Sequence, residues 1–487
     1  MRTPFRFASL VLLGSLFVVN VYRAASQSIT HDEALTYLWF VAKPWAEVFT
    51  TYDANHHVLF TILCKVAVSA FGPSEFVMRL PTLLACLVYF WAMFRLCEAV
   101  FGIGWRLFLA VAALSLHPLI LDFLSAARGY GLALAFFTLG LVALLRFLRN
   151  PAEAAANRWL VVWPGLILAL AVCSNLIYLV PVTGAILTSL SIYWLDRHRS
   201  PLPPESGLLA LPAVARLLIA PFLTLCWLVL IFPLSAASPD HFYYGAHSWR
   251  ELSESLAVVS FLSNPAYALL PNTMWLQYAI DAGIAIALLG LGLIAFRNWR
   301  RADAAGVELL LLAGTTFASL VAITGGFAIA GIALPVGRTL VYWIFLLTFA
   351  GLLVIRFAPG PRWVSWLLAV PMLVVLAQYA LEWRTTFYGD WLFHRDFRSI
   401  ISYISKDHSR LGAKPVIVAG SWEMAAPLNY YRETRNLNWM APMERETDPP
   451  EASYWIFAVQ DAAQVEKRGL KTVWKDPLSG TVLAVRP

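Results

Sequence analysis

Charged residues are scarce in this chain. Asp, Glu, Lys and Arg make up 13% of its 487 residues, whereas ordinary soluble domains carry about a quarter. Hydrophobic residues make up 60%, with 20 Trp, 18 Tyr and 30 Phe among the aromatic side chains. This balance excludes an ordinary soluble globular protein and predicts a polytopic membrane protein.

Cysteine is also rare, and glycine-rich nucleotide-binding motifs are missing. All five cysteines lie in apolar stretches, which excludes a disulfide framework and a cysteine-based metal site. No GxGxxG or Walker pattern, internal repeat or low-complexity tract occurs. The net charge of +7 comes from Lys and Arg that lie mainly at the ends of apolar runs. These charges therefore predict membrane orientation and no nucleic-acid partner.

The apolar runs set the expected topology. We expect an uncleaved first span over residues 2–22, with its basic start in the cytoplasm. The run from His57 to Phe71 has 15 residues, whereas a span needs about 20. If this run does not cross, every later basic cluster falls in the cytoplasm, as the positive-inside rule requires. We therefore predict a re-entrant or interfacial helix at 55–71 and about eleven spans. The remaining spans are predicted near 79–98, 106–122, 130–147, 159–177, 178–195, 213–234, 273–296, 305–328, 338–355 and 364–381.

The composition becomes polar and charged after about residue 382. We therefore expect a mostly α membrane domain over 1–381, with a first external loop at 23–78, and a small external α/β domain over 382–487. About a hundred residues suffice for such a core. Its predicted elements are helices opening at 391 and spanning 423–432, and strands at 415–420, 455–459 and 481–485.

Two adjacent acids, Asp32 and Glu33, follow the first span. Thr30 and Glu33 have the spacing of a capping box, in which the glutamate reaches back to the cap amide. Asp32 lies in the same turn, where the helix dipole favours its ionised form. Neighbouring residues point to different sides of a helix, so the two acids are not a facing glycosidase pair. We predict Asp32 as the catalytic base and retain Glu33 as a second catalytic candidate.

Three arginines are predicted at the outer ends of spans, in the compartment of Asp32. They are Arg79, Arg128 and Arg338. Each one alone is typical of an anchor at a membrane boundary. Together near one acid they would form a phosphate clamp, because a guanidinium group binds phosphate oxygens in bidentate fashion. Asp122 lies inside a predicted span and needs a partner, for which Arg128 is close in sequence.

Four short motifs follow one another within roughly the first 150 residues. They are Asp32-Glu33-Ala34, Asn55-His56-His57-Val58-Leu59, Phe71-Gly72-Pro73-Ser74-Glu75 leading to Arg79-Leu80-Pro81, and Leu121-Asp122-Phe123-Leu124-Ser125-Ala126-Ala127-Arg128-Gly129-Tyr130. By these motifs the chain resembles the GT-C superfamily of integral-membrane glycosyltransferases, in particular bacterial proteins similar to protein O-mannosyltransferases and aminoarabinose transferases. The resemblance implies a GT-C fold with juxtamembrane helices in the first external loop.

The resemblance also implies a reaction. A sugar would move, with inversion, from a polyprenyl-phosphate donor to a hydroxyl of a glycan, lipid or protein at the extracytoplasmic face of the bacterial inner membrane. Asp32 and Glu33 match the acidic catalytic motif, and Arg79, Arg128 and Arg338 match positions near the lipid phosphate. No cofactor is expected. The candidate substrate-binding residues are His57, Asn55, Asp122, Tyr130 and Tyr37.

Other functions remain open from the residues alone. A transporter or flippase would suit many spans with intramembrane charges, although the charges gather on one side and no pair of broken helices occurs in matching halves. An oligosaccharide ligase and an inactive scaffold for the C-terminal domain are further alternatives. A divalent metal held by Asp32, Asp53, His56 and His57 is a weaker hypothesis, since adjacent histidines seldom point at one ion.

Overall fold

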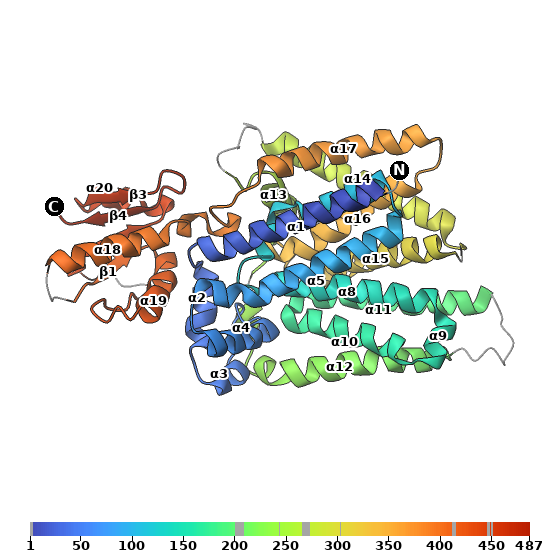
Figure 1. Ribbon diagram of the computed structural model, residues 1–487, viewed down its shortest axis with the longest axis horizontal. Helices are drawn as coiled ribbons and strands as arrows, with labels where there is room; N and C mark the ends of the chain where they lie inside the picture. Colours follow the sequence, from blue (N-terminus) through green and yellow to red (C-terminus); the bar gives the residue numbers. More distant parts are fainter. Residues whose placement is uncertain are drawn as a thin grey trace.

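The computed structural model places a long helical bundle beside a small C-terminal domain (Figure 1). It describes residues 3–199, 209–242, 244–264, 273–301, 303–411, 415–445, 449 and 451–487. Most bundle helices run along the long axis of the molecule, and the C-terminal sheet lies beyond one end of them (Figure 1). The start of the chain lies at the opposite end (Figure 1). Which face of the membrane each end occupies stays a prediction.

Nine helices in the described part of the chain are long and apolar enough to cross a bilayer. The protein is therefore an integral membrane protein. In the bundle, α8 packs on α5, α11 packs on α15, and α14 packs on α16. The nine are α1 (Thr3–Ser26), α5 (Glu75–Phe101), α8 (Gly129–Arg149), α11 (Leu179–Arg199), α12 (Leu211–Ser235), α14 (Thr273–Asn298), α15 (Ala304–Ala330), α16 (Val341–Phe357) and α17 (Arg362–Leu381).

Helix α4 (Val58–Phe71) has 14 residues and does not carry the chain across the bundle. Arg79, near the start of α5, donates hydrogen bonds to the carbonyl oxygens of Ala24 and Gln27 at the end of α1. Because α5 begins where α1 ends, the segment between them returns to the same end of the bundle. The predicted short helix that does not cross is therefore confirmed at 58–71, and the parity of the later spans stays a prediction. The first loop also holds the predicted juxtamembrane helices, namely α2 (His31–Thr36), the π-helix η1 (Tyr37–Val41) and α3 (Trp45–Thr50).

Two predicted spans are shorter than expected. The predicted span 106–122 is instead two helices, α6 (Trp105–Ser115) and α7 (Pro118–Phe123). The chain breaks there because Pro118 disfavours helical geometry at the residue before it, and the His117 ring caps α7 by accepting the N–H of Leu119. Helix α10 (Trp159–Ser174) has 16 residues and follows the short α9 (Pro151–Ala156). The count of about eleven crossings therefore stays a prediction.

The C-terminal domain contains a four-stranded sheet with the order β1-β2-β4-β3. β1 (Val418–Gly420) runs parallel to β2 (Tyr454–Phe457), and β4 (Val482–Val485) runs antiparallel to β2 and to β3 (Lys471–Lys475). The three predicted strands are confirmed near their predicted positions. The sequence does not predict β3, because exposed lysines on an edge strand hide its pattern. The helices of the C-terminal domain are α18 (Phe397–Leu411), α19 (Ala425–Thr434) and α20 (Ala463–Lys467). One further helix, α13 (Trp249–Phe261), belongs to the membrane part.

Side chains fasten this domain to the end of the bundle. The Tyr431 hydroxyl in α19 accepts the N–H of Ile29 at 3.1 Å and donates to the Glu75 carboxylate at 2.8 Å. Arg398 in α18 ion-pairs with the same carboxylate at 2.8 Å. The domain is therefore bound to the segment after α1 and to the first turn of α5.

Helix α8 begins in a crowded position. A Cβ added to Gly131 would lie 2.0 Å from the carbonyl oxygen of Phe123 in α7. A Cβ added to Gly129 would lie 2.1 Å from the carbonyl oxygen of Ser174 at the end of α10. These glycines permit the close approach that sets the position of Arg128, the residue immediately before α8.

We predict that Gly131→Ala destabilises the protein by about 1–3 kcal/mol, because the added methyl forces α7 and α8 apart. Thermal unfolding of the detergent-solubilised protein measures this change. Gly14→Ala in α1 is the matched control, since nothing lies within 4 Å of its added Cβ. The control should be neutral or gain up to about 1 kcal/mol from helix propensity. Equal stability of the two variants would contradict the crowding.

Candidate active site

Helix α2 carries the two adjacent acids. The Thr30 hydroxyl accepts the N–H of Glu33 at 3.4 Å, and the Glu33 carboxylate accepts the N–H of Thr30 at 2.9 Å. The predicted capping box is therefore confirmed. Successive residues of a helix point about 100° apart, so Asp32 and Glu33 face different partners.

Glu33 is locked to Arg79 in a fully buried ion pair, with Nη2 at 2.6 Å and Nε at 2.8 Å from its carboxylate oxygens. It also accepts the N–H of Ala127 at 2.6 Å. The other three N–H groups of Arg79 go to the carbonyl oxygens of Ala24, Gln27 and Ser28. All five donors of the guanidinium are thus used.

This arrangement corrects two roles suggested by the sequence. Arg79 has no donor left for a donor phosphate, because protein oxygens take all of them. Glu33 has no free oxygen for a substrate, because an arginine and two backbone amides saturate it. Both residues build the scaffold that holds α2.

Asp32 instead meets the two other predicted arginines. Its Oδ2 lies 2.5 Å from Nη1 of Arg338 and 3.7 Å from Nη2 of Arg128. The Asp32 side chain is 10% exposed, that of Arg128 1% and that of Arg338 24%. Burial alone would raise the pKa of Asp32, but Arg338 and then Arg128 hold this pKa below its usual value. The carboxylate is therefore ionised at neutral pH.

Arg128 is held in place by neutral oxygens as well as by Asp32. Its Nη1 donates to the side-chain oxygen of Asn55 and, at 3.4 Å, to the hydroxyl of Thr36. The Asn55 amide donates in turn to the Asp32 carbonyl at 3.0 Å and to Thr36 at 3.2 Å. Asn55 is therefore part of the cluster, where it positions Arg128. Thr36 was not predicted from the sequence to take part in this cluster.

His57 and Tyr130 pack against each other, with ring centroids 4.9 Å apart in an edge-on arrangement. Burial, with a smaller effect of Arg128, holds the pKa of His57 well below its usual value, so its ring is neutral. Its buried Nε2 has no hydrogen-bond partner among the described residues. The predicted role of His57 in substrate binding stays a prediction.

The metal hypothesis gains no support from the geometry. In the described ranges, no group of three or more His, Cys, Asp or Glu side chains is placed to hold an ion. His56 stacks on Phe40 at 4.0 Å, away from the carboxylate cluster around Asp32.

Asp122 does not pair with Arg128, contrary to the sequence interpretation. Its carboxylate ion-pairs with Arg23 at the end of α1 and, at 2.5 Å, with Arg384. It also accepts the N–H of Gly389 at 2.8 Å. These partners are about 100 and 260 positions away in sequence, so proximity along the chain was misleading. Asp122 joins α1, α7 and the segment leading to the C-terminal domain, and this structural role replaces the predicted contact with substrate.

Tyr37 also faces the protein interior. Its ring packs edge-on against Tyr430 of α19, with centroids 5.1 Å apart. Its position at the contact between the first loop and the C-terminal domain gives it a packing role, and its predicted contact with substrate stays a prediction.

A second carboxyl group, Asp390, lies near the cluster and was missed from the sequence. It belongs to the 3₁₀ helix η7 (Gly389–His394) and is half-buried. Burial raises its pKa to about 6; Arg338 opposes this rise, and the negative charges of Asp122 and Asp32 add to it. Its sequence context carries no motif, so only the fold reveals it.

Tyr244 borders the exposed side of the cluster. The Arg338 guanidinium carbon lies 4.9 Å from the centre of the Tyr244 ring. Arg338 itself lies in the 3₁₀ helix η6 (Gly337–Leu340), directly before α16. Arg338 is the most exposed of the three predicted arginines, at 24%. It lies at a predicted membrane boundary.

No family model and no curated protein matches this chain. Among solved structures, ArnT from Cupriavidus metallidurans in the apo state aligns with a TM-score of 0.44 and 13% identity over 98% of each chain. ArnT from the same organism bound to undecaprenyl phosphate aligns with a TM-score of 0.37 and 14% identity, covering 98% of this chain and 97% of that one. Arabinosyltransferase EmbB from Mycobacterium smegmatis gives 0.34 and 12%, covering 80% of this chain and 42% of its own.

The TM-scores are low, so the roles of individual residues in this chain are inferred from its own geometry.

We predict that Glu33→Gln costs about 3–5 kcal/mol of stability, because it leaves the Arg79 charge buried without a counter-ion. The yield and thermal midpoint of the purified protein measure this loss. Glu98→Gln is the control, because its partners Arg6 and Arg95 are about half exposed, and such surface pairs contribute about 0–1 kcal/mol. A Glu33→Gln protein as stable as the control would show that the pair is not structural.

Proposed function

We propose that this protein is an inverting glycosyltransferase that uses a polyprenyl-phosphate sugar and transfers the sugar to an acceptor hydroxyl at the extracytoplasmic face of the bacterial inner membrane. The observation that carries this proposal is the ionised Asp32 carboxylate within ion-pair distance of Arg338 and Arg128 at one end of the bundle. One base and two cations are the groups that such a reaction needs. The four sequence motifs support the same reaction class.

The chemistry assigns one role to each group. The acceptor oxygen attacks the anomeric carbon from the face opposite the phosphate, and the bond from that carbon to the phosphate oxygen breaks. The acceptor proton passes to Asp32 as general base. The departing polyprenyl phosphate takes the electron pair without needing a proton, and Arg338 and Arg128 stabilise its growing charge.

The ion pair between Arg338 and Asp32 offers a way to recognise the phosphate of the donor. Arg338 pairs with Asp32, and its partly exposed guanidinium can reorient toward an incoming phosphate. Asp32 would then lose a stabilising cation, and its proton affinity would rise. Donor binding therefore turns a weak base into a stronger one.

Transport remains the weaker alternative. The site charges gather at one end of the bundle, beside the C-terminal domain, whereas the binding sites of secondary transporters lie near the bilayer midplane. No observation on the described residues favours a substrate path between the two ends.

We predict that Asp32→Asn in proteoliposomes lowers sugar transfer by about 10²–10⁴-fold while the protein stays folded, because the general base is lost. Release of polyprenyl phosphate from a panel of labelled polyprenyl-phosphate sugars, in the presence of membrane acceptors, measures turnover. Asp240→Asn is the control, since Asp240 is exposed and outside the cluster. Near-normal turnover of the Asp32 variant would remove this residue from the mechanism.

Asp390 should make donor binding sensitive to pH. Its pKa of about 6 means that it becomes charged as the pH rises through that value, and the added negative charge competes with phosphate for Arg338. A phosphate diester keeps one charge throughout, and Asp32 stays ionised. We expect the donor KM to rise between about pH 5 and about pH 8, and to stay low and constant in Asp390→Asn. An unchanged pH profile in that variant would contradict the assignment.

A further inference from the structure

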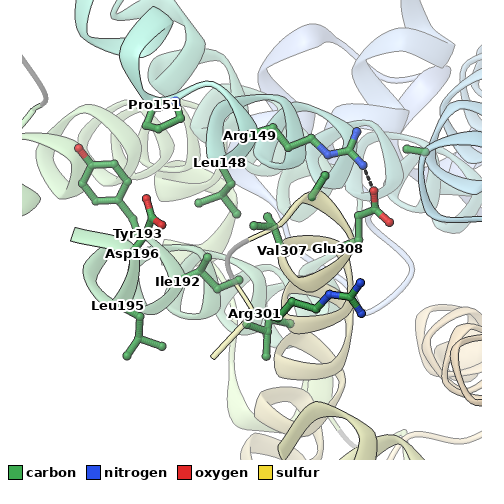
Figure 2. A pocket seen from close by; sticks show the side chains of 13 residues that line it. Leu148, Arg149, Pro151, Ile192, Tyr193, Leu195, Asp196, Arg301, Val307 and Glu308 are labelled. Atoms are coloured by element: carbon green, nitrogen blue, oxygen red, sulfur yellow. Dashed lines mark ion pairs between the residues drawn. The ribbon is translucent and has the colours of Figure 1, made fainter. Parts of the chain in front are cut away.

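A cavity of about 550 Å³ lies at the end of the bundle opposite Asp32 (Figure 2). It is formed where α5, α8 and α11 end and where α15 begins. Its position at these helix ends places it at the membrane–water boundary. The residues that line it are Ala99, Leu148, Arg149, Pro151, Ile192, Tyr193, Leu195, Asp196, Arg301, Ala304, Val307, Glu308 and Leu310.

A buried glutamate, Glu308, lines the cavity, and one of its carboxylate oxygens lacks a hydrogen-bond donor in the described part of the chain. Glu308 is 2% exposed, and one of its carboxylate oxygens pairs with Arg149. The other oxygen, Oε2, has no hydrogen-bond partner among the described residues. A buried carboxylate oxygen without a donor is costly, so a ligand that brings an N–H or O–H group to it would be stabilised.

A second arginine, Arg301, also lines the cavity. Arg301 pairs through Nε with Asp303, and its side chain is about half exposed. In the view of Figure 2, the Glu308 carboxylate lies between the guanidinium groups of Arg149 and Arg301. The wall of the cavity therefore carries both a buried carboxylate and a half-exposed guanidinium group.

Several apolar side chains also line the cavity, together with Tyr193 and Asp196. Leu148, Ile192, Leu195, Val307 and Leu310 contribute side chains from three different helices. A small soluble zwitterion would leave this surface uncovered, whereas the glycerol and first methylenes of a lipid would cover it. Basic pockets between membrane helices near the bilayer surface are known to take lipid head groups.

We propose that this cavity binds the head group of a membrane phospholipid that carries a phosphate diester and a primary ammonium group. The phosphate contacts Arg301, and an ammonium N–H donates to the free Oε2 of Glu308. The site is separate from the cluster around Asp32, so it does not depend on the proposed reaction.

Native mass spectrometry of the delipidated full-length protein tests this assignment. Phosphatidylethanolamine should bind about tenfold or more tightly than phosphatidylcholine, whose trimethylammonium group has no N–H to donate to a charged acceptor. Glu308→Gln should remove most of this preference. Arg301→Gln should weaken the binding of both lipids, whereas Arg300→Gln, an exposed neighbour that does not line the cavity, should leave binding unchanged.

Several results would overturn the proposal. Equal affinity for the two lipids would exclude the ammonium contact, and tighter binding of phosphatidylglycerol would exclude the acid as the selective group. Displacement of phosphatidylethanolamine by equimolar soluble phosphoethanolamine would identify a soluble ligand in place of a lipid. If Glu308→Gln does not fold, the comparison of Arg301→Gln with Arg300→Gln still decides, because equal binding by these two variants contradicts the phosphate contact.

Discussion

The buried ion pair between Glu33 and Arg79 fixes the part of the molecule on which the site depends. It joins four segments that are distant in sequence, namely the end of α1, the start of α2, the first turns of α5 and the turn before α8. A buried charge pair of this kind persists only when every donor and acceptor is satisfied, and here all five arginine donors are used. With α2 fixed in this way, the neighbouring side chain of Asp32 contacts Arg128 and Arg338.

Asp32 and Glu33 therefore have different roles, because they face different partners. Glu33 is saturated and holds the backbone, whereas Asp32 keeps contact with a partly exposed cation. The two arginines around Asp32 also differ, because Arg128 is fixed by Asn55 and Thr36 while Arg338 stands at the solvent side. A fixed cation keeps the carboxylate ionised, and a movable one is free to exchange a carboxylate for a phosphate.

The sequence predicted the features that depend on residues close together along the chain. The capping box follows from Thr30 and Glu33 at the required spacing, and the predicted parity of the helices follows from the distribution of basic residues. The convergence of Arg128 and Arg338 on Asp32 follows from that parity. The sequence did not reveal that Arg79 is saturated, that Asp122 binds Arg23 and Arg384, or that Asp390 lies near the cluster. These are long-range contacts, which no periodicity or spacing encodes.

The C-terminal domain packs against the start of α2. Its carbonyl group at Glu423 lies 2.9 Å from Nδ1 of His31, and Trp422 packs edge-on against the same ring. The domain thus covers the first residue of α2 and leaves exposure at Arg338 and half-buried Asp390. Arg338 directly precedes an apolar helix, so the open side of the cluster lies at the level where lipid phosphates reside. In the proposed reaction, a donor phosphate that stays in its lipid layer would therefore reach Arg338 without leaving the membrane surface.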